Sequence, residues 1–283
     1  MWNYNVVMAK KNGKDHVTLL LVLIGLVGVG LVSYPSIANW WNSFHQSRAV
    51  SEYTQTVANM NSDEYTEILD AADAYNQRLA RTGILWNTSD EQKADYESQL
   101  DVSGTGVMGY INIPKIEVTL PIYHGTSEEV LQIAVGHIEQ TSLPVGGEST
   151  HAVISSHRGL PSAKLFTDLD EMVVGDTFTI TVLDRTVTYE VDQIRVVLPD
   201  DLSALAIEEG KDYCTLVTCT PYGVNTHRLL VRGHRVANAQ GEARVVADAV
   251  QITPARVAPF IAIPILIIAI ISVFIRTSGK KKE

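Results

Sequence analysis

The longest apolar stretches of the sequence lie near its two ends. Residues 17–34 and 258–275 form two uncharged runs of 18 residues each, close to the ~20 residues with which an α-helix crosses about 30 Å of hydrocarbon. Three lysines precede the first run, and Arg276 and three lysines follow the second. Because basic flanks stay on the cytoplasmic side, this pattern predicts two transmembrane segments, both termini in the cytoplasm, and residues 36–255 outside the cell membrane.

These runs divide the chain into segments. The predicted order is a cytoplasmic tail (1–16), a transmembrane segment or signal anchor (17–35), a helical N-terminal region (36–81), a lid-like loop (82–103), a β-rich domain (104–238), a linker (239–257), a transmembrane segment (258–275) and a basic cytoplasmic tail (276–283). Ser36-Ile37-Ala38 also fits a signal-peptide cleavage site, so the first run is either retained or removed. Both alternatives leave the middle of the chain outside the cytoplasm.

The period of the apolar positions changes once between the two runs. Residues 40–81 show helical spacing, with a break and N-cap at Asn61-Ser62-Asp63, whereas residues 82–103 are polar and predict a loop. From Gly104 onward, short apolar runs alternate with Gly and Pro, which predicts seven or eight strands in a small barrel or sandwich. The runs are 107–113, 118–122, 152–155, 177–183, 187–197, 214–219 and 228–236, and short helices are expected at 127–132, 162–169 and 202–208.

The charge of the chain is unevenly distributed. The formal net charge is −10, but the two flanks hold seven Lys or Arg and only two acids, which leaves 15 basic and 30 acidic side chains between the apolar runs. An acidic domain argues against binding nucleic acid or an anionic membrane surface. It is compatible with a partner that carries amines, but solubility outside the cell is the simpler explanation.

The chain has two cysteines, Cys214 and Cys219, within one β-like run. Five residues of extended strand span about 17 Å, and an odd separation places the two side chains on opposite faces. A disulfide needs Cα atoms within about 7 Å, so these cysteines cannot bridge. Cys214 is expected to be a buried strand residue, which leaves Cys219 as the candidate nucleophile.

Arg228 is the candidate partner of this thiol. The strand that ends at Cys219 is followed by turn residues, including Pro221 and Gly223, and a second strand begins at Arg228. If the two strands pair, Arg228 returns to the level of Cys219. A cation there favours the reactive thiolate and can bind a substrate carbonyl as negative charge develops on its oxygen.

A thiol nucleophile also needs a group that transfers protons, usually histidine. Among eight histidines, His157 ends the apolar run 152–155 and opens the loop Arg158-Gly-Leu-Pro, and strand ends are where site residues gather. A surface histidine is the competing interpretation. His124 and His137 have no metal-ligand spacing, so neither a metal nor another cofactor is predicted.

These motifs together resemble the sortase family. The stretch Thr215-Leu-Val-Thr-Cys219-Thr with Arg228 resembles its cysteine motif, and His157-Arg-Gly-Leu-Pro-Ser resembles its histidine motif. Val107-Met-Gly-Tyr-Ile-Asn-Ile-Pro-Lys-Ile, Thr141-Ser-Leu-Pro-Val-Gly-Gly and Thr220-Pro-Tyr-Gly-Val-Asn-Thr-His-Arg, as well as a C-terminal span with a basic tail, resemble class C, the pilin-polymerising sortases. The resemblance covers residues 104–236 nearly continuously.

The resemblance implies a mainly β fold: a closed eight-stranded β-barrel with short helices, preceded by the helical region and flanked by the two transmembrane segments. It implies a Gram-positive origin, catalysis by His157, Cys219 and Arg228, and cleavage of an LPxTG-like signal between Thr and Gly. The acyl group then passes to an amine, in class C a pilin lysine. Thr218, Tyr222 and Leu160 are the candidate substrate-binding residues.

The sequence departs from class C in the segment just before the barrel. That class covers its site with a lid bearing Asp-Pro-aromatic, whereas this chain reads Ile84-Leu-Trp86-Asn-Thr-Ser-Asp90, without Asp-Pro. Trp86 is the lid candidate, and an exposed or stalk-packed Trp is the alternative. Two other functions stay open. One is an enzyme with another acceptor, either a cell-wall-anchoring sortase or a hydrolytic cysteine peptidase, and the other is a non-catalytic pilus assembly scaffold.

Overall fold

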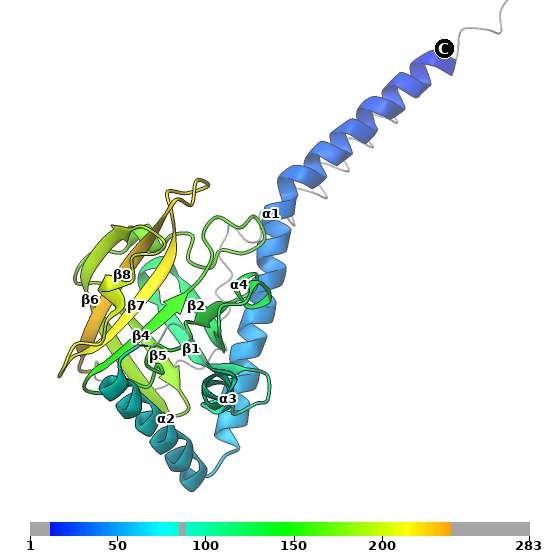
Figure 1. The fold of residues 1–283 in the computed structure, drawn as a ribbon. Coiled ribbons are helices and arrows are strands. Elements are labelled where there is room, and N and C mark those ends of the chain that lie inside the picture. The colour runs from blue at the N-terminus through cyan, green and yellow to red at the C-terminus, as the bar shows by residue number, and fades with distance from the viewer. Residues whose placement is uncertain (1–11, 85–88, 239–283) are drawn as a thin grey trace, which may run out of the picture. The chain divides into compact units, whose positions relative to one another are not determined.

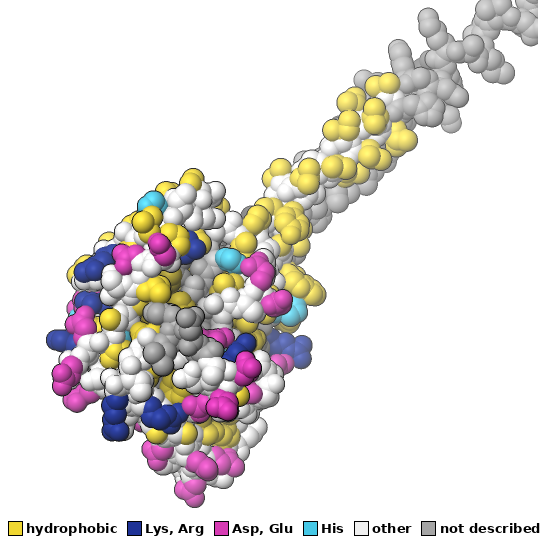
Figure 2. Space-filling model, viewed as in Figure 1, with side chains coloured by type: hydrophobic (Ala, Val, Ile, Leu, Met, Phe, Trp, Pro, Cys, Tyr) yellow, Lys and Arg dark blue, Asp and Glu magenta, His cyan; other side chains and the backbone are white. Residues whose placement is uncertain are grey.

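The computed structural model describes residues 12–84 and 89–238. The described residues divide into two compact units, one up to residue 40 and the other from residue 41 onward. The helix α1 (Asn12–Ala58) begins in the first unit, where its apolar side chains are exposed (Figure 2). By length and composition this helix can cross a membrane, as predicted for the first apolar run. The second predicted span, residues 258–275, lies outside the described residues.

The second unit contains a closed barrel of eight strands (Figure 1). Around the barrel the order is β1-β2-β3-β4-β7-β8-β6-β5. The strands are β1 (Val107–Ile113), β2 (Val118–His124), β3 (Val135–His137), β4 (Thr150–Ser155), β5 (Thr177–Val182), β6 (Arg185–Val197), β7 (Asp212–Thr220) and β8 (His227–Val236). The pairs β2–β3 and β4–β7 are parallel, and the others are antiparallel. The seven predicted runs all correspond to strands. The eighth, β3, is too short to show an alternating pattern.

The faces of β7 separate two groups of apolar side chains. Cys214 and Leu216 point to the same side of the strand, because they are two residues apart. Both belong to the main core. Val217 points to the other side and joins a smaller group. We call this group the outer cluster, since it includes Leu205 from the β6–β7 connection, and a connection lies outside a closed barrel. The outer cluster consists of Val153, Leu205, Val217 and Leu230.

The two helices predicted between residues 40 and 81 are present as the end of α1 and as α2. The helix α2 (Ser62–Thr82) begins with a capping box at the expected break. The Asn61 side chain accepts hydrogen bonds from the backbone of Asp63 and Glu64, and the Glu64 carboxylate accepts one from the backbone of Asn61. The last part of α1 packs on the barrel through Tyr53. Its buried hydroxyl donates to the Met108 carbonyl (3.0 Å) and accepts from the Leu183 N–H (2.8 Å).

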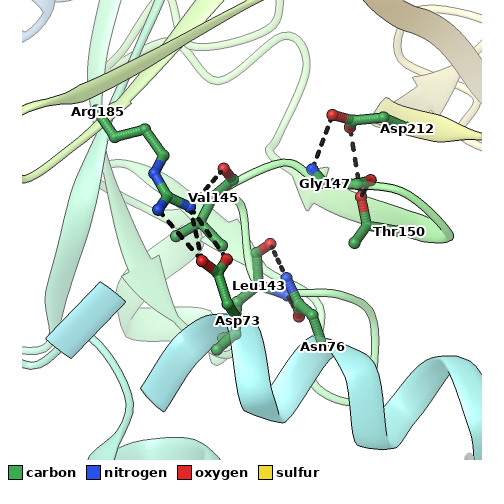
Figure 3. A network of polar contacts seen from close by, with 8 residues as sticks. All are labelled: Asp73, Asn76, Leu143, Val145, Gly147, Thr150, Arg185 and Asp212. Atoms are coloured by element: carbon green, nitrogen blue, oxygen red, sulfur yellow. Dashed lines mark hydrogen bonds and ion pairs between the residues drawn. The ribbon is translucent and has the colours of Figure 1, made fainter. Parts of the chain in front are cut away.

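A polar network holds α2 against the barrel (Figure 3). The buried amide of Asn76 makes two hydrogen bonds with the backbone of Leu143, at 2.7 and 3.1 Å. Beside it, the Arg185 guanidinium binds both carboxylate oxygens of Asp73, at 3.0 and 3.2 Å. Two-point contacts of this kind set orientation as well as distance, so α2 is fixed to the strands that it covers.

The prediction of a continuous loop over residues 82–103 was wrong. A third helix, α3 (Asp90–Ser98), forms within this stretch. Its composition is polar because only Tyr96 is buried, so the helix lacks the apolar stripe by which helices are recognised. The signal that was overlooked is Ser89 with Gln92, which form a capping box at its start. Trp86 lies outside the described residues.

Of the three short helices predicted in the β-domain, one is present, one is absent and one is reduced to a single 3₁₀ turn. The expected helix at 127–132 is present as α4 (Glu128–Leu131). Residues 162–169 form turns rather than a helix, with Leu165 in the left-handed region (φ 42°). Only a 3₁₀ turn, Ser203–Leu205, forms within residues 202–208. Both segments are fixed by tertiary contacts, which override weak helical propensity.

Burial of His137 predicts how stability depends on pH. The imidazole is fully buried, with Nδ1 at 3.0 Å from the Tyr96 hydroxyl and Nε2 at 2.8 Å from the Ser142 carbonyl. Burial lowers the pKa of His137 to about 4, whereas an unfolded histidine titrates near 6.5. Between these values the unfolded chain binds the additional proton. The free energy of unfolding is therefore expected to fall by up to about 3 kcal/mol as the pH drops from about 7 to 4.

Chemical denaturation of residues 41–250 at pH 7.5, 6, 5 and 4 measures this effect. His137→Gln should be less stable at pH 7.5 but should lose less free energy of unfolding as the pH falls. Other buried groups titrate in both proteins, so the difference between the two slopes isolates His137. Parallel slopes for the wild type and the variant would contradict the prediction.

Candidate active site

The site is assembled around β7, which pairs with a different strand on each side. Its neighbour β8 is antiparallel, and Cys219 is the direct cross-strand partner of Arg228. Its other neighbour, β4, is parallel, and the last ladder pair is Ser155 with Val217. The chain then continues by one more backbone hydrogen bond, from the Ser156 N–H to the Val217 carbonyl (3.1 Å). His157 therefore follows β4 at the level of Cys219.

Cys219 and Arg228 also share a face. Val217 and Leu230 belong to the outer cluster. Cys219 and Arg228 lie two residues from them along β7 and β8, so they continue the same alternation. The barrel thus places thiol and guanidinium on the outer face of two paired strands, and His157 follows the neighbouring strand β4 at the same end.

The imidazole of His157 is only partly enclosed. Its side chain is 27% exposed, and Nε2 lies 3.7 Å from the Oε2 of Glu128 at the start of α4. The other carboxylate oxygen of Glu128 accepts a hydrogen bond from Gln132 (2.6 Å). Among the described residues, Nε2 of His157 has no hydrogen-bond partner although the atom is buried. Nε2 of His157 therefore faces the Glu128 carboxylate, and no hydrogen bond within the described residues competes with proton transfer at this atom.

The two thiols differ in environment. Cys219 is partly exposed and Cys214 is buried, and neither forms a disulfide, in agreement with the prediction from their odd spacing. Burial raises the pKa of the Cys214 thiol well above its usual value, because a thiolate would lose its solvation in the core. Cys214 is therefore inert packing, whereas Cys219 meets solvent.

Arg228 also retains unused donors. Its Nη1 donates to the carbonyls of Asn225 (3.3 Å) and His227 (3.2 Å), both in its own turn. Within residues 12–84 and 89–238 it forms no ion pair with a carboxylate. A guanidinium has five N–H donors, so Arg228 can bind an additional oxygen atom beside Cys219.

The candidate substrate-binding residues occupy three different environments. Thr218 is buried, and its hydroxyl donates to the Ser156 carbonyl (2.8 Å), so it links the ends of β7 and β4. Leu160 is half-buried against the main core. Tyr222 is 59% exposed in the turn between Cys219 and Arg228. Their contact with a substrate stays a prediction.

Comparisons with known proteins identify the family. The family profile described as "Sortase domain" matches residues 111–236. A crystal structure of sortase C1 from Streptococcus agalactiae is 56% identical, with a TM-score of 0.67, and the match covers 68% of this chain and 100% of that chain. This chain belongs to the sortase family. Its structural neighbours assign it to the class C sortases.

Two further relatives extend the comparison. A crystal structure of the lid-mutant of sortase C1 from Streptococcus agalactiae is 42% identical, with a TM-score of 0.59, and the match covers 67% of this chain and 98% of that chain. Sortase D of Bacillus subtilis (strain 168) is 31% identical over 131 residues, which cover 45% of this chain and 63% of that relative. The family profile thus matches the barrel, and the two structural matches extend over about two thirds of this chain.

Two features of the site were missed by sequence reasoning. One is Glu128, which looked like any acidic residue at a helix start. The other is Arg158, which directly follows His157 and has a side chain only 9% exposed. An arginine between a motif histidine and a glycine is a signal that could have been followed, since buried arginines need several partners.

This sortase also has a cavity away from these residues. It has a volume of about 760 Å³ and lies at the opposite end of β4 and β7, where Asp73, Gly147, Thr150 and Arg185 contribute to its lining (Figure 3). None of the candidate catalytic residues lines it. Within the described part of the chain, no three His, Cys, Asp or Glu side chains are grouped so that they could hold a metal ion.

The contrast between the two thiols is testable by labelling. Native protein treated with dithiobis(nitrobenzoate) should release one equivalent of thionitrobenzoate from the reagent, as Cys219 forms a mixed disulfide with it. Unfolding in guanidinium should raise this to two, as Cys214 becomes exposed. Cys219→Ala should release none in the native state, and Cys214→Ala should still release one. Fast reaction of Cys214 in folded protein would contradict the assignment.

Proposed function

We propose that this sortase cleaves an LPxTG-like sorting signal between Thr and Gly and transfers the threonyl group to an amine. The observation that supports this most directly is the register of β4, β7 and β8, which pairs Cys219 with Arg228 and ends β4 beside them, two residues before His157. A thiol, a proton-transfer group and an oxyanion donor are the three components that acyl transfer through a thioester needs.

In the first half-reaction, the Cys219 thiolate attacks the Thr carbonyl. Negative charge develops on the carbonyl oxygen, and the free donors of Arg228 stabilise it. The C–N bond to Gly then breaks, and the protonated imidazole of His157 gives its proton to the departing amine. The products are a thioester on Cys219 and a peptide with a new N-terminal Gly.

In the second half-reaction, an amine attacks the thioester. His157, now neutral, takes the proton that the amine loses, and Arg228 again holds the developing oxyanion. The C–S bond breaks and the thiolate of Cys219 is restored. The energy of the cleaved peptide bond is conserved in the thioester, so the cycle balances without ATP or another cofactor.

The acceptor that we propose is a lysine side chain of a pilin subunit. Similarity to sortase C1 structures supports this choice over a peptidoglycan amine. The acidic character of the region between the apolar runs also suits a cationic acceptor. We further propose that residues 36–255 act outside the cell membrane, with both termini in the cytoplasm.

Intact-mass spectrometry tests the acyl-transfer step. Incubation of residues 41–250 with an LPETG peptide should give an adduct on Cys219 that ends at the threonine. Cys219→Ala should give none, because it has no nucleophile. Arg228→Met should lower the rate of adduct formation by about 100-fold or more, the cost of losing one oxyanion donor.

The acceptor is tested by adding amines to the acyl-enzyme. A peptide with a pilin lysine should replace water as acceptor and give an isopeptide product. Release of only the free acid would instead indicate a hydrolytic peptidase, and a preference for a peptidoglycan stem amine would indicate cell-wall anchoring. No adduct with any peptide, even after Trp86→Ala, would favour the non-catalytic scaffold.

The lid proposal concerns Trp86. A lid-mutant form of a sortase C1 has been crystallised, and Trp86 is the aromatic residue of the corresponding segment here. If Trp86 covers the site, Trp86→Ala should raise the rate of iodoacetamide alkylation of Cys219 several-fold. Trp41→Ala, at an exposed position of α1, is the matched control. Equal alkylation rates for all three proteins would rule out a lid at Trp86.

A further inference from the structure

His157 and Cys219 lie beyond the last pair of the ladder that joins β4 to β7. This ladder ends at Ser155 and Val217. Past it, two hydrogen bonds of Ser156 continue the connection, to the Val217 carbonyl and from the Thr218 hydroxyl. The strand β4 has ended before His157, whereas β7 continues to Thr220 in its pairing with β8. The separation between imidazole and thiol therefore needs another constraint, because it is not set by the pairing of β4 with β7.

Arg158 connects the segment that follows His157 to the end of β7. Its guanidinium forms an ion pair with Asp170 (2.5 Å), donates to the Thr167 carbonyl through Nε (3.0 Å), and reaches the Thr220 hydroxyl through Nη1 (3.4 Å). Asp170 and Thr167 belong to the turns that follow His157 in the chain, whereas Thr220 directly follows Cys219. The side chain thus joins the loop after His157 to the end of β7.

The exposed ring of Tyr222 packs against the guanidinium of Arg158. Its ring centroid lies 5.8 Å from the guanidinium carbon of Arg158, within the range of a cation–π contact. The same ring lies against Gly159, whose φ is +78° and where a Cβ atom would be only 2.9 Å from the ring. The glycine after Arg158 is therefore needed both for the turn and for the approach of Tyr222.

We propose that Arg158 is a positioning residue that fixes the distance between His157 and Cys219. This inference rests on the proposed function, since it concerns proton transfer between those two groups. A near-buried guanidinium with four partners has one orientation, and each partner is attached to one of the two loops. Loss of Arg158 removes none of the three proposed catalytic side chains but lets the His157 loop move relative to the end of β7.

The competing explanation is that Arg158 contributes only to stability. Arg185 provides a matched control, because it makes a comparable ion pair, with Asp73, at the opposite end of the barrel. A purely structural arginine should behave alike at both places. A positioning residue should affect the reaction only beside the site.

The test uses the full chain in detergent micelles and compares Arg158→Met with Arg185→Met. For cleavage of an LPETG peptide, Arg158→Met should lower kcat by about 10- to 100-fold, the range expected from a displacement of about 1 Å at reacting groups. Its KM should stay within a factor of about three, because the peptide does not need Arg158 for binding. Arg185→Met should lower the melting temperature while kcat stays near that of the wild type.

Two further variants locate the effect. Arg158→Lys keeps the charge but cannot contact Asp170, Thr167 and Thr220 together. Its kcat should therefore be closer to that of Arg158→Met than to that of the wild type. Thr220→Val removes one attachment point and should lower kcat by a smaller factor. Combined with Arg158→Met it should add no further loss, since both changes break the same connection.

Several results would overturn the inference while the wild type still forms its thioester. These are an unchanged kcat in Arg158→Met, full activity in Arg158→Lys, and equal losses of kcat in Arg158→Met and Arg185→Met at equal melting temperature. Absence of the thioester in the wild type would be a different result. It would refute the proposed function itself and, with it, the need for a positioning residue.

Discussion

The arrangement of this molecule depends on the two-sided pairing of β7. A parallel partner and an antiparallel partner flank the same strand, so the hairpin of β7 and β8 is brought into register with β4, some 60 residues earlier in the chain. The alternation of side chains then assigns each of them to the core or to the outer face. A shift of one residue in either ladder would turn Cys219 into the core and Cys214 outward. The tightly filled interior resists such a shift, because Cys214 and Leu216 are completely buried.

The histidine and arginine side chains of the barrel fall into two groups, which differ in whether their hydrogen-bonding atoms are all used. His137 and His151 are buried, and each has hydrogen-bond partners at both ring nitrogens, so neither has capacity left for chemistry. His157 and Arg228 lie at the end of the strands and retain donors or acceptors that the described residues do not use. This contrast separates structural from reactive residues of the same type. It follows from position along the strands and could not be read from composition.

The local parts of the fold were predictable from the sequence. The hairpin with Cys219 and Arg228 is set by turn residues and alternation over short distances, and the capping box at Asn61 is a local signal. The neighbours of β4 were not predictable, because a parallel pairing across some 60 residues leaves no local trace. The same applies to Arg158, whose partners come from two loops. Helix propensity misled at residues 162–169, where contacts with the site decide the backbone.

The position of Cys214 has a consequence for oxidative damage. Cys219 is the exposed thiol of a chain with only two cysteines, and the other is on the opposite face of the same strand. A sulfenic acid at Cys219 therefore has no resolving cysteine within the molecule and cannot be protected as an internal disulfide. Unless a thiol from another molecule intercepts it, further oxidation gives the sulfinic acid, which is generally irreversible. The working lifetime of the protein in oxidising surroundings is thus set by reductants that come from outside the chain.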